Sequence, residues 1–314
     1  MPPPSPFRPE SDDPIARPPS QGQEPGAALR PDRPWYATGV RLDAEDFQAE
    51  QLYHRSRLAE GLRWLGGCGT LTGLRVRWQE ATPASGGTAA TEEEIVVQPG
   101  LAVDRFGRLI SLTRPHCLRL NPWLAGLANR DPWLRQRTEG DTTLRLVVAD
   151  VFIRFLALPR GYTPAVAAGP FDATDAVQPN RIRDSHRLEL VPRPREMGMG
   201  EGLPVDPWAP LRTSTVNRWQ VLQDLILDGA LAGNPPPAEG PGEGALRNRP
   251  EHSGGVDPSA LFLARLEIPV APPGDPPLSR LASRRVTVRN DLREFLLSTP
   301  ALAAWAGVPA RSNP

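Results

Sequence analysis

The feature that most constrains the fold is one change of hydrophobic period at a run of glycines, within residues 35–112. Before the glycines, apolar residues fall in one broad stripe when residues 43–65 are wound at roughly 3.6 residues per turn. The stripe consists of Ala44, Phe47, Leu58, Leu62 and Leu65, and Gln51 and Arg55 interrupt it. We therefore predict an amphipathic helix over residues 43–65 that packs on a sheet.

The ends of this helix are marked more clearly than its stripe. Asp43 can accept hydrogen bonds from the free amides of the first turn, and Glu45 and Asp46 suit the positive end of the helix dipole. Gly66 and Gly67 supply the left-handed residue that ends a helix.

After the glycines the pattern changes to that of a sheet. Apolar and polar residues tend to alternate in residues 71–78. Residues 94–98, 101–104 and 109–112 form short strand-like runs. Asp104 stands first and Gly107 last in a four-residue turn, as a type I turn prefers. The last two runs are therefore predicted to pair as a hairpin.

The longest strand pattern covers residues 143–155, and we place it centrally in the sheet. Asp150 and Arg154 interrupt its apolar run, and they can point to an outer face or pair across strands. Further strands are predicted at 186–191, 260–270 and 285–288. Helices are predicted as two short pieces within 121–137, at 214–228 with a buried apolar face, and as closing turns at 291–297 and 301–305.

Composition divides the chain of 314 residues into one foldable part and its loops. Its 39 prolines and 28 glycines are concentrated in the N-terminal region and in three loops. We expect a Pro-rich disordered or extended arm at residues 1–34, one α+β, strand-dominated domain with a mixed or antiparallel sheet at 35–306, and a tail at 307–314. The loops are expected at 157–180, 192–213 and 230–257, with disorder at 234–257.

The charges balance, with 36 basic and 36 acidic residues, and every basic residue is Arg. This balance does not favour a nucleic-acid partner, which would call for a basic excess. The chain has no signal-peptide pattern and no apolar run approaching roughly 18 residues, so we expect a cytoplasmic protein without a membrane span. Cys68 and Cys117 are then expected to be reduced thiols.

The sequence offers no recognisable catalytic pattern. Gly67, Gly69 and Gly73 follow a helix and precede a strand, which is the reverse of a dinucleotide fingerprint. The four histidines lack metal-site spacing, and His116 and Cys117 point to opposite faces of a strand. Asp104 and Asp184 can form an acid pair, but turn capping and Arg pairing explain them more simply. We expect no catalytic residue, no cofactor, no metal and no enzymatic activity.

Three motifs stand out along the chain. The first runs through residues 39–53, 67–76 and 97–108, and it contains Asp46-Phe47, Glu50-Gln51 and Gly100-Leu101-Ala102-Val103-Asp104. The second is 180–190 and the third is 263–266. Together they resemble a family of bacterial proteins encoded beside phage-tail-like contractile injection systems. The resemblance covers most of residues 35–290. Cys68 departs from it, since His or another polar residue is expected there, and the loops after Pro192 and Gly229 are specific to this chain.

The resemblance implies a structural subunit of a contractile particle, at or around the baseplate. Other particle subunits are the expected partners, and a homo-oligomer is expected within the assembly. The alternative is a carbohydrate-binding module or an enzyme whose site is built from the long loops, which no motif supports.

Overall fold

The computed structural model of the chain describes residues 33–84, 90–127, 132–139, 142–164, 177–206, 209–227, 246, 248–271 and 278–306. The expected arm, except for residues 33 and 34, and the tail at 307–314 lie outside these residues. Within them the strands outnumber the helices and pair antiparallel, which confirms the strand-dominated α+β fold.

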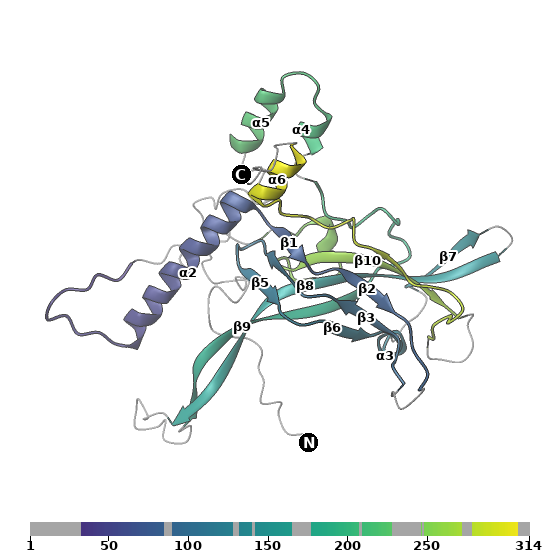
Figure 1. Cartoon of the computed structure of the whole chain (residues 1–314), viewed down its shortest axis with the longest axis horizontal. Helices are drawn as coiled ribbons and strands as arrows, with labels where there is room; N and C mark the ends of the chain where they lie inside the picture. The colour runs from purple at the N-terminus through teal and green to yellow at the C-terminus, as the bar shows by residue number, and fades with distance from the viewer. Residues whose placement is uncertain are drawn as a thin grey trace, which may run out of the picture.

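The strands form three antiparallel sheets (Figure 1). One sheet has the order β1-β4-β5, with β1 (Gly69–Gly73), β4 (Gly100–Val103) and β5 (Leu109–Leu112). A second has the order β2-β3-β6, with β2 (Val76–Gln79), β3 (Glu94–Val97) and β6 (His116–Arg119). The largest contains β7 (Leu134–Glu139), β8 (Thr142–Pro164), β9 (Val177–Pro192), β10 (Leu261–Val270) and β11 (Thr287–Arg289).

Strand β8 is the centre of the largest sheet, as the sequence predicted. One edge pairs with β10, which in turn pairs with β11. The other edge pairs first with β7, up to Val147, and then with β9, from Ala149 onward. Beyond Ile153 only β9 accompanies β8, so the two strands leave the sheets as a ribbon (Figure 1).

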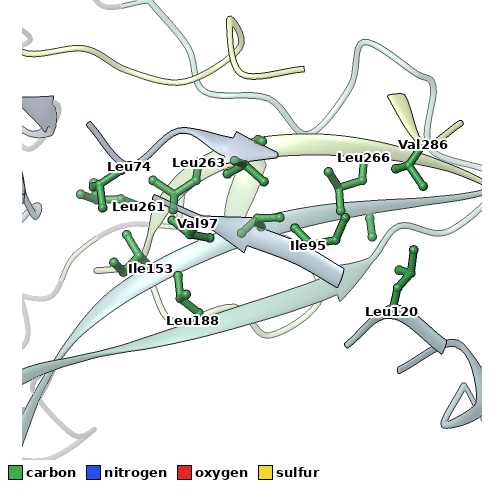
Figure 2. Packing of buried hydrophobic residues seen from close by; sticks show 14 of the residues in the cluster. Leu74, Ile95, Val97, Leu120, Ile153, Leu188, Leu261, Leu263, Leu266 and Val286 are labelled. Carbon is green, nitrogen blue, oxygen red and sulfur yellow. The ribbon is translucent and has the colours of Figure 1, made fainter. Parts of the chain in front are cut away.

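The main core lies between one face of this sheet and the two smaller sheets (Figure 2). Alternate residues of β8 from Val147 to Ala157 face this core, as the two-residue period of a strand requires. They meet Leu74, Ile95, Val97, Leu261, Leu263 and other fully buried apolar side chains.

The opposite face of β8 is buried as well, and it carries a charge. Phe152 packs with Val256, Ala260 and Phe262 in a second apolar cluster. Beside it lies the fully buried carboxylate of Asp150. Arg265 of β10 is its cross-strand partner, with Nε 2.8 Å from Oδ1 and Nη2 2.9 Å from Oδ2, and Arg193 Nε lies 2.6 Å from Oδ2. Asp150 therefore pairs across strands, one of the two predicted alternatives.

These two buried arginines also hold the loops that cover this face. Arg193 donates to the carbonyl oxygen of Glu251 and to Ser253. Arg265 donates to the carbonyl oxygens of Met199, Glu201 and Gly202. One carboxylate thus fixes two guanidinium groups, and their remaining donors fix two loops.

The predicted hairpin at 101–112 is confirmed as β4 and β5. Asp104 Oδ1 accepts from the amides of Phe106 and Arg108, both at 2.9 Å, and Gly107 has a φ of 85°. A Cβ at Gly107 would lie 1.8 Å from the carbonyl oxygen of Ala59. The turn can approach the first helix this closely only because it carries glycine.

The helices are α2 (Ala44–Gly66), α3 (Leu120–Ala125), α4 (Ala209–Thr213), α5 (Arg218–Leu227) and α6 (Thr299–Trp305), with a 3-10 turn, η2 (Pro250–His252). The predicted ends of α2 are confirmed. Asp43 Oδ1 accepts from the amides of Glu45 and Asp46, and Gly67 follows the helix with a φ of 85°.

All three predicted loops contain regular structure, and the loop expected at 192–213 ends in helix α4. The described parts of 157–180 form a ribbon, because β8 runs to Pro164 and β9 begins at Val177; residues 165–176 lie outside the described part. Backbone hydrogen bonds between β8 and β9 hold this ribbon, and Arg160, Gly161 and Asn180 in it are exposed, so the sequence lacks an apolar alternation there. In the loop expected at 230–257, residues 248–257 are ordered and bury Glu251 and His252, because Arg193 binds this segment.

Three predicted helical features are also wrong. The second piece within 121–137 is strand β7, which pairs along β8. Residues 291–297 form no helix, because Leu296 donates its amide to the carbonyl of Thr70 and Phe295 bridges to the same residue. Helix α5 exists but has no buried residue.

We predict that Asp150→Asn lowers the free energy of unfolding by about 3–5 kcal/mol, because it leaves two buried guanidinium groups without their counter-charge. Urea denaturation of the purified chain measures this loss. Asp184→Asn, on the exposed part of β9, serves as the control and should change the free energy by less than about 0.5 kcal/mol. A loss below about 1 kcal/mol for Asp150→Asn would contradict the role assigned to this carboxylate.

Candidate functional site

Helix α2 turns its apolar stripe away from the sheets. Phe47, Leu58 and Leu65 are 51%, 65% and 93% exposed, and Ser56 is the only buried residue of the helix. The inward face carries Leu52, Ser56, Ala59 and Arg63, which are buried or half-buried. The amphipathic helix was thus predicted correctly, but its stripe is not the side that packs on the domain.

The physical reason lies in the hairpin turn under the helix. The close approach of Gly107 to Ala59 requires a small side chain on the inward face, and Ser56 lies one turn away. The buried hydroxyl of Ser56 has a hydrogen-bond partner within the helix, because Oγ donates to the carbonyl oxygen of Tyr53, 2.9 Å away. A bulky residue such as Phe47 or Leu58 suits the outer face instead.

Two further helices present large apolar side chains to solvent. Trp219 and Leu227 of α5 are 68% and 81% exposed, and Trp305 of α6 is 80% exposed. Helices α4 and α5 stand outside the sheets, close to α6 and to the end of α2 in the view of Figure 1. Residues 294–296, which lead to α6, bond to Thr70 just beyond α2. Exposed apolar groups of this kind mark interaction surfaces when they gather in patches.

A polar cluster lies beneath the loop that contains η2. A small cavity there is lined by Gly69, Arg105, Arg249, Glu251, Phe262 and Glu294, among others. Arg249 Nη1 lies 2.9 Å from Oε1 and 2.8 Å from Oε2 of Glu294, and this charge raises the pKa of Arg249 against the opposing effect of burial. Arg105 Nη1 donates to the carbonyl oxygen of Pro258 at 2.7 Å. The cluster joins β1, the β4–β5 turn and the covering loop.

The thiol in this cluster is poorly suited to nucleophilic chemistry. Cys68 Sγ donates to Glu294 Oε2 at 3.4 Å, and burial together with the charge of Glu294 raises the pKa of Cys68 to about 12. A thiol with such a pKa is protonated near neutral pH, whereas catalytic cysteines have lowered values. The charges of Arg249 and Arg105 lower the pKa of Cys68, but by less than burial and Glu294 raise it.

His252, in the same cluster, is held as a neutral imidazole. Its Nδ1 accepts from the amide of Arg249 at 3.3 Å, so Nε2 carries the proton and donates to the carbonyl oxygen of Ala260 at 2.8 Å. Burial lowers the pKa of His252 to about 4, and the charges of Arg105 and Arg249 act in the same direction. Both ring nitrogens are occupied, which suits a structural role.

The structure brings together only one pair of the four histidines. The rings of His116 and His186 lie 5.8 Å apart, and burial and the neighbouring imidazole lower the pKa of His186. No three His, Cys, Asp or Glu side chains form a possible metal site within the described ranges. Asp104 is buried, with Oδ2 2.6 Å from Arg108 Nε, whereas Asp184 is exposed on β9.

No protein-family model and no curated protein matches the chain. Among its described helices, none is both long enough and apolar enough to cross a membrane.

We predict that the fold loses roughly 2–3 kcal/mol of stability through His252 as the pH falls from 7 to 4.5. The unfolded chain binds a proton at its ordinary pKa, near 6.5, while the folded state resists protonation down to about 4, so acid favours unfolding in this window. Burial raises the pKa of Glu251, which contributes in the opposite sense.

The comparison that isolates His252 is between the chain and a His252→Asn variant, each unfolded by urea at both pH values. Between the two pH values, the free energy of unfolding of His252→Asn should fall by about 2–3 kcal/mol less than that of the original chain. The control is His54→Asn, at an exposed histidine, which should behave like the original chain. Equal acid sensitivity of the chain and His252→Asn would refute the assignment.

Proposed function

We propose that the protein is a structural subunit of a phage-tail-like contractile injection particle, at or around its baseplate. The observation that carries this proposal is the set of exposed apolar side chains on α2, α5 and α6, outside a well-packed sheet domain. Large aromatic groups in solvent suit permanent contacts with other subunits. The motifs at 39–53, 97–108 and 180–190 supply the identity of the particle through their family resemblance.

The polar cluster supports the same interpretation. Its charged groups pair with one another or with backbone carbonyls, its thiol has a raised pKa, and its histidine has both nitrogens bonded. Such groups stabilise a junction between strands and a loop. The proposal includes a cytoplasmic location, homo-oligomerisation within the assembly, no nucleic-acid partner and no enzymatic activity.

We expect the double variant Trp219→Ser, Leu227→Ser to fold normally but to enter particles at least about tenfold less, because aromatic anchors at interfaces contribute roughly 2 kcal/mol or more. Quantitative immunoblotting of gradient-purified particles measures the incorporation. Val205→Ser, which alters an exposed apolar residue in the loop before α4, is the control. Normal incorporation of the double variant, or absence of the original chain from particles with sheath and tube subunits, would count against the proposal.

Deletion of residues 1–32 gives a second test. The segment is rich in proline, so docking it along a partner surface costs less conformational entropy than ordering a flexible chain. We expect the thermal melt of the truncated protein to stay nearly unchanged while its incorporation into particles falls. Incorporation at the normal level would mean that the arm is dispensable, and loss of the fold would mean that it is part of the domain.

A further inference from the structure

The outward face of α2 has the shape of a helix-pairing surface. Wound at 100° per residue, Phe47, Leu58 and Leu65 fall within a narrow arc that also contains Gly61. Helix α2 has 23 residues and therefore extends roughly 35 Å, long enough to support an interface along its length. Gly61 has nothing within 4 Å of the position that a Cβ would take, so it leaves a notch in this face.

The charges on α2 are separated along its axis. The N-terminal half, residues 44–54, carries Glu45, Asp46 and Glu50 and no basic residue other than His54. The C-terminal half, residues 55–66, carries Arg55, Arg57 and Arg63 with a single acid, Glu60. Arg63 lies on the inward face, so the opposite charges that match a copy running in the opposite direction are Glu50 of the first half and Arg57 of the second. Two antiparallel helices also align their dipoles favourably.

We infer that two copies of this chain pair through α2, antiparallel, about a twofold axis near the middle of the helix. A twofold axis makes the interface self-complementary, so each contact occurs twice. This inference rests on the proposed role as an assembly subunit, and it names the surface through which the homo-oligomer forms.

One register satisfies both the charges and the apolar stripe. If the twofold axis passes between Tyr53 and His54, residue 50 of one copy lies level with residue 57 of the other. Glu50 then faces Arg57 of the second copy on the same flank of the pair. Phe47 lies level with a point between Leu58 and Gly61 of the second copy, where the notch of the glycine receives its ring.

The present contacts of these charges leave them accessible. Arg57 Nη1 lies 2.9 Å from Glu60, and Glu50 accepts from Tyr36 Oη at 2.8 Å and lies 3.9 Å from His54 Nε2. All of these groups are at least one-third exposed, and pairs of this kind within one helix contribute only about 0.3–0.5 kcal/mol each. They can reorganise when a second copy approaches.

Charge reversal with rescue tests the pairing on the purified full-length chain, by sedimentation velocity across a concentration series. Glu50→Arg alone and Arg57→Glu alone each place like charges at two symmetric positions, so each should raise the dimer dissociation constant at least about tenfold. The double variant, Glu50→Arg with Arg57→Glu, restores opposite charges and should return the constant to within about threefold of the original. Glu80→Arg, an exposed charge reversal after β2, is the control and should have no effect.

A crosslink tests the register directly. In a Cys117→Ser background, His54→Cys should form a disulfide-linked dimer on mild oxidation, because residue 54 lies beside its own copy at the axis. Gln48→Cys, exposed on another side of the same helix, should not. Thermal melts of every variant show whether the fold is kept.

Three results would overturn the pairing: a monomeric chain up to about 100 µM, additive rather than rescued effects in the double charge variant, or equal crosslinking at positions 48 and 54. A chain that is monomeric alone but loses particle incorporation on Glu50→Arg would assign α2 to a different subunit. The incorporation test on α5 is separate from these measurements, so the pairing and the proposed function can fail independently.

Discussion

The carboxylate of Asp150 is the group on which the arrangement of the covering loops depends. It lies on the face of β8 opposite the main core, where a charge is costly unless it is paired. Arg193 and Arg265 pair with it, and their remaining donors reach the backbone of residues 199–202 and 251–253. The loops therefore cover β8 because the carboxylate of Asp150 holds two guanidinium groups in place, and these bind the loop backbone. The second apolar cluster forms beside them.

Other arginine side chains also donate to loop carbonyl oxygens, and the high proline content explains why. Proline has no amide hydrogen, so a loop rich in proline has more backbone acceptors than donors. A guanidinium group carries five donors and can correct the imbalance. Arg280 donates to the carbonyl oxygens of Pro269, Leu281 and Arg284 while its Nε lies 2.9 Å from Glu93. Arg105 and Arg135 donate to the carbonyls of Pro258 and Pro194. Lysine, with three donors on one atom, cannot span such a set.

The sequence predicted what depends on local rules. The cap at Asp43, the stop at Gly67, the turn at Asp104–Gly107 and the central place of β8 all follow from neighbouring residues. It did not predict that the stripe on α2 faces outward, because periodicity shows that a helix has two faces and not which of them meets the domain. Nor did it identify the polar cluster, whose members Cys68, Arg105, Arg249 and Glu294 come from four separate segments. The sequence shows that every basic residue is arginine, but we did not predict such clusters from it.

Strand β8 also determines how the protein would respond to mechanical load. The ribbon formed by β8 and β9 continues without a break into the sheet, where β8 pairs with β10 from Arg145 to Ile153. Antiparallel hydrogen bonds run perpendicular to the strands. A force applied at the tip of the ribbon and directed along β8 would therefore load these bonds together in shear, instead of opening them one at a time. A pull transmitted through the ribbon would be borne by a strand whose residues from Leu146 to Ile153 are all buried.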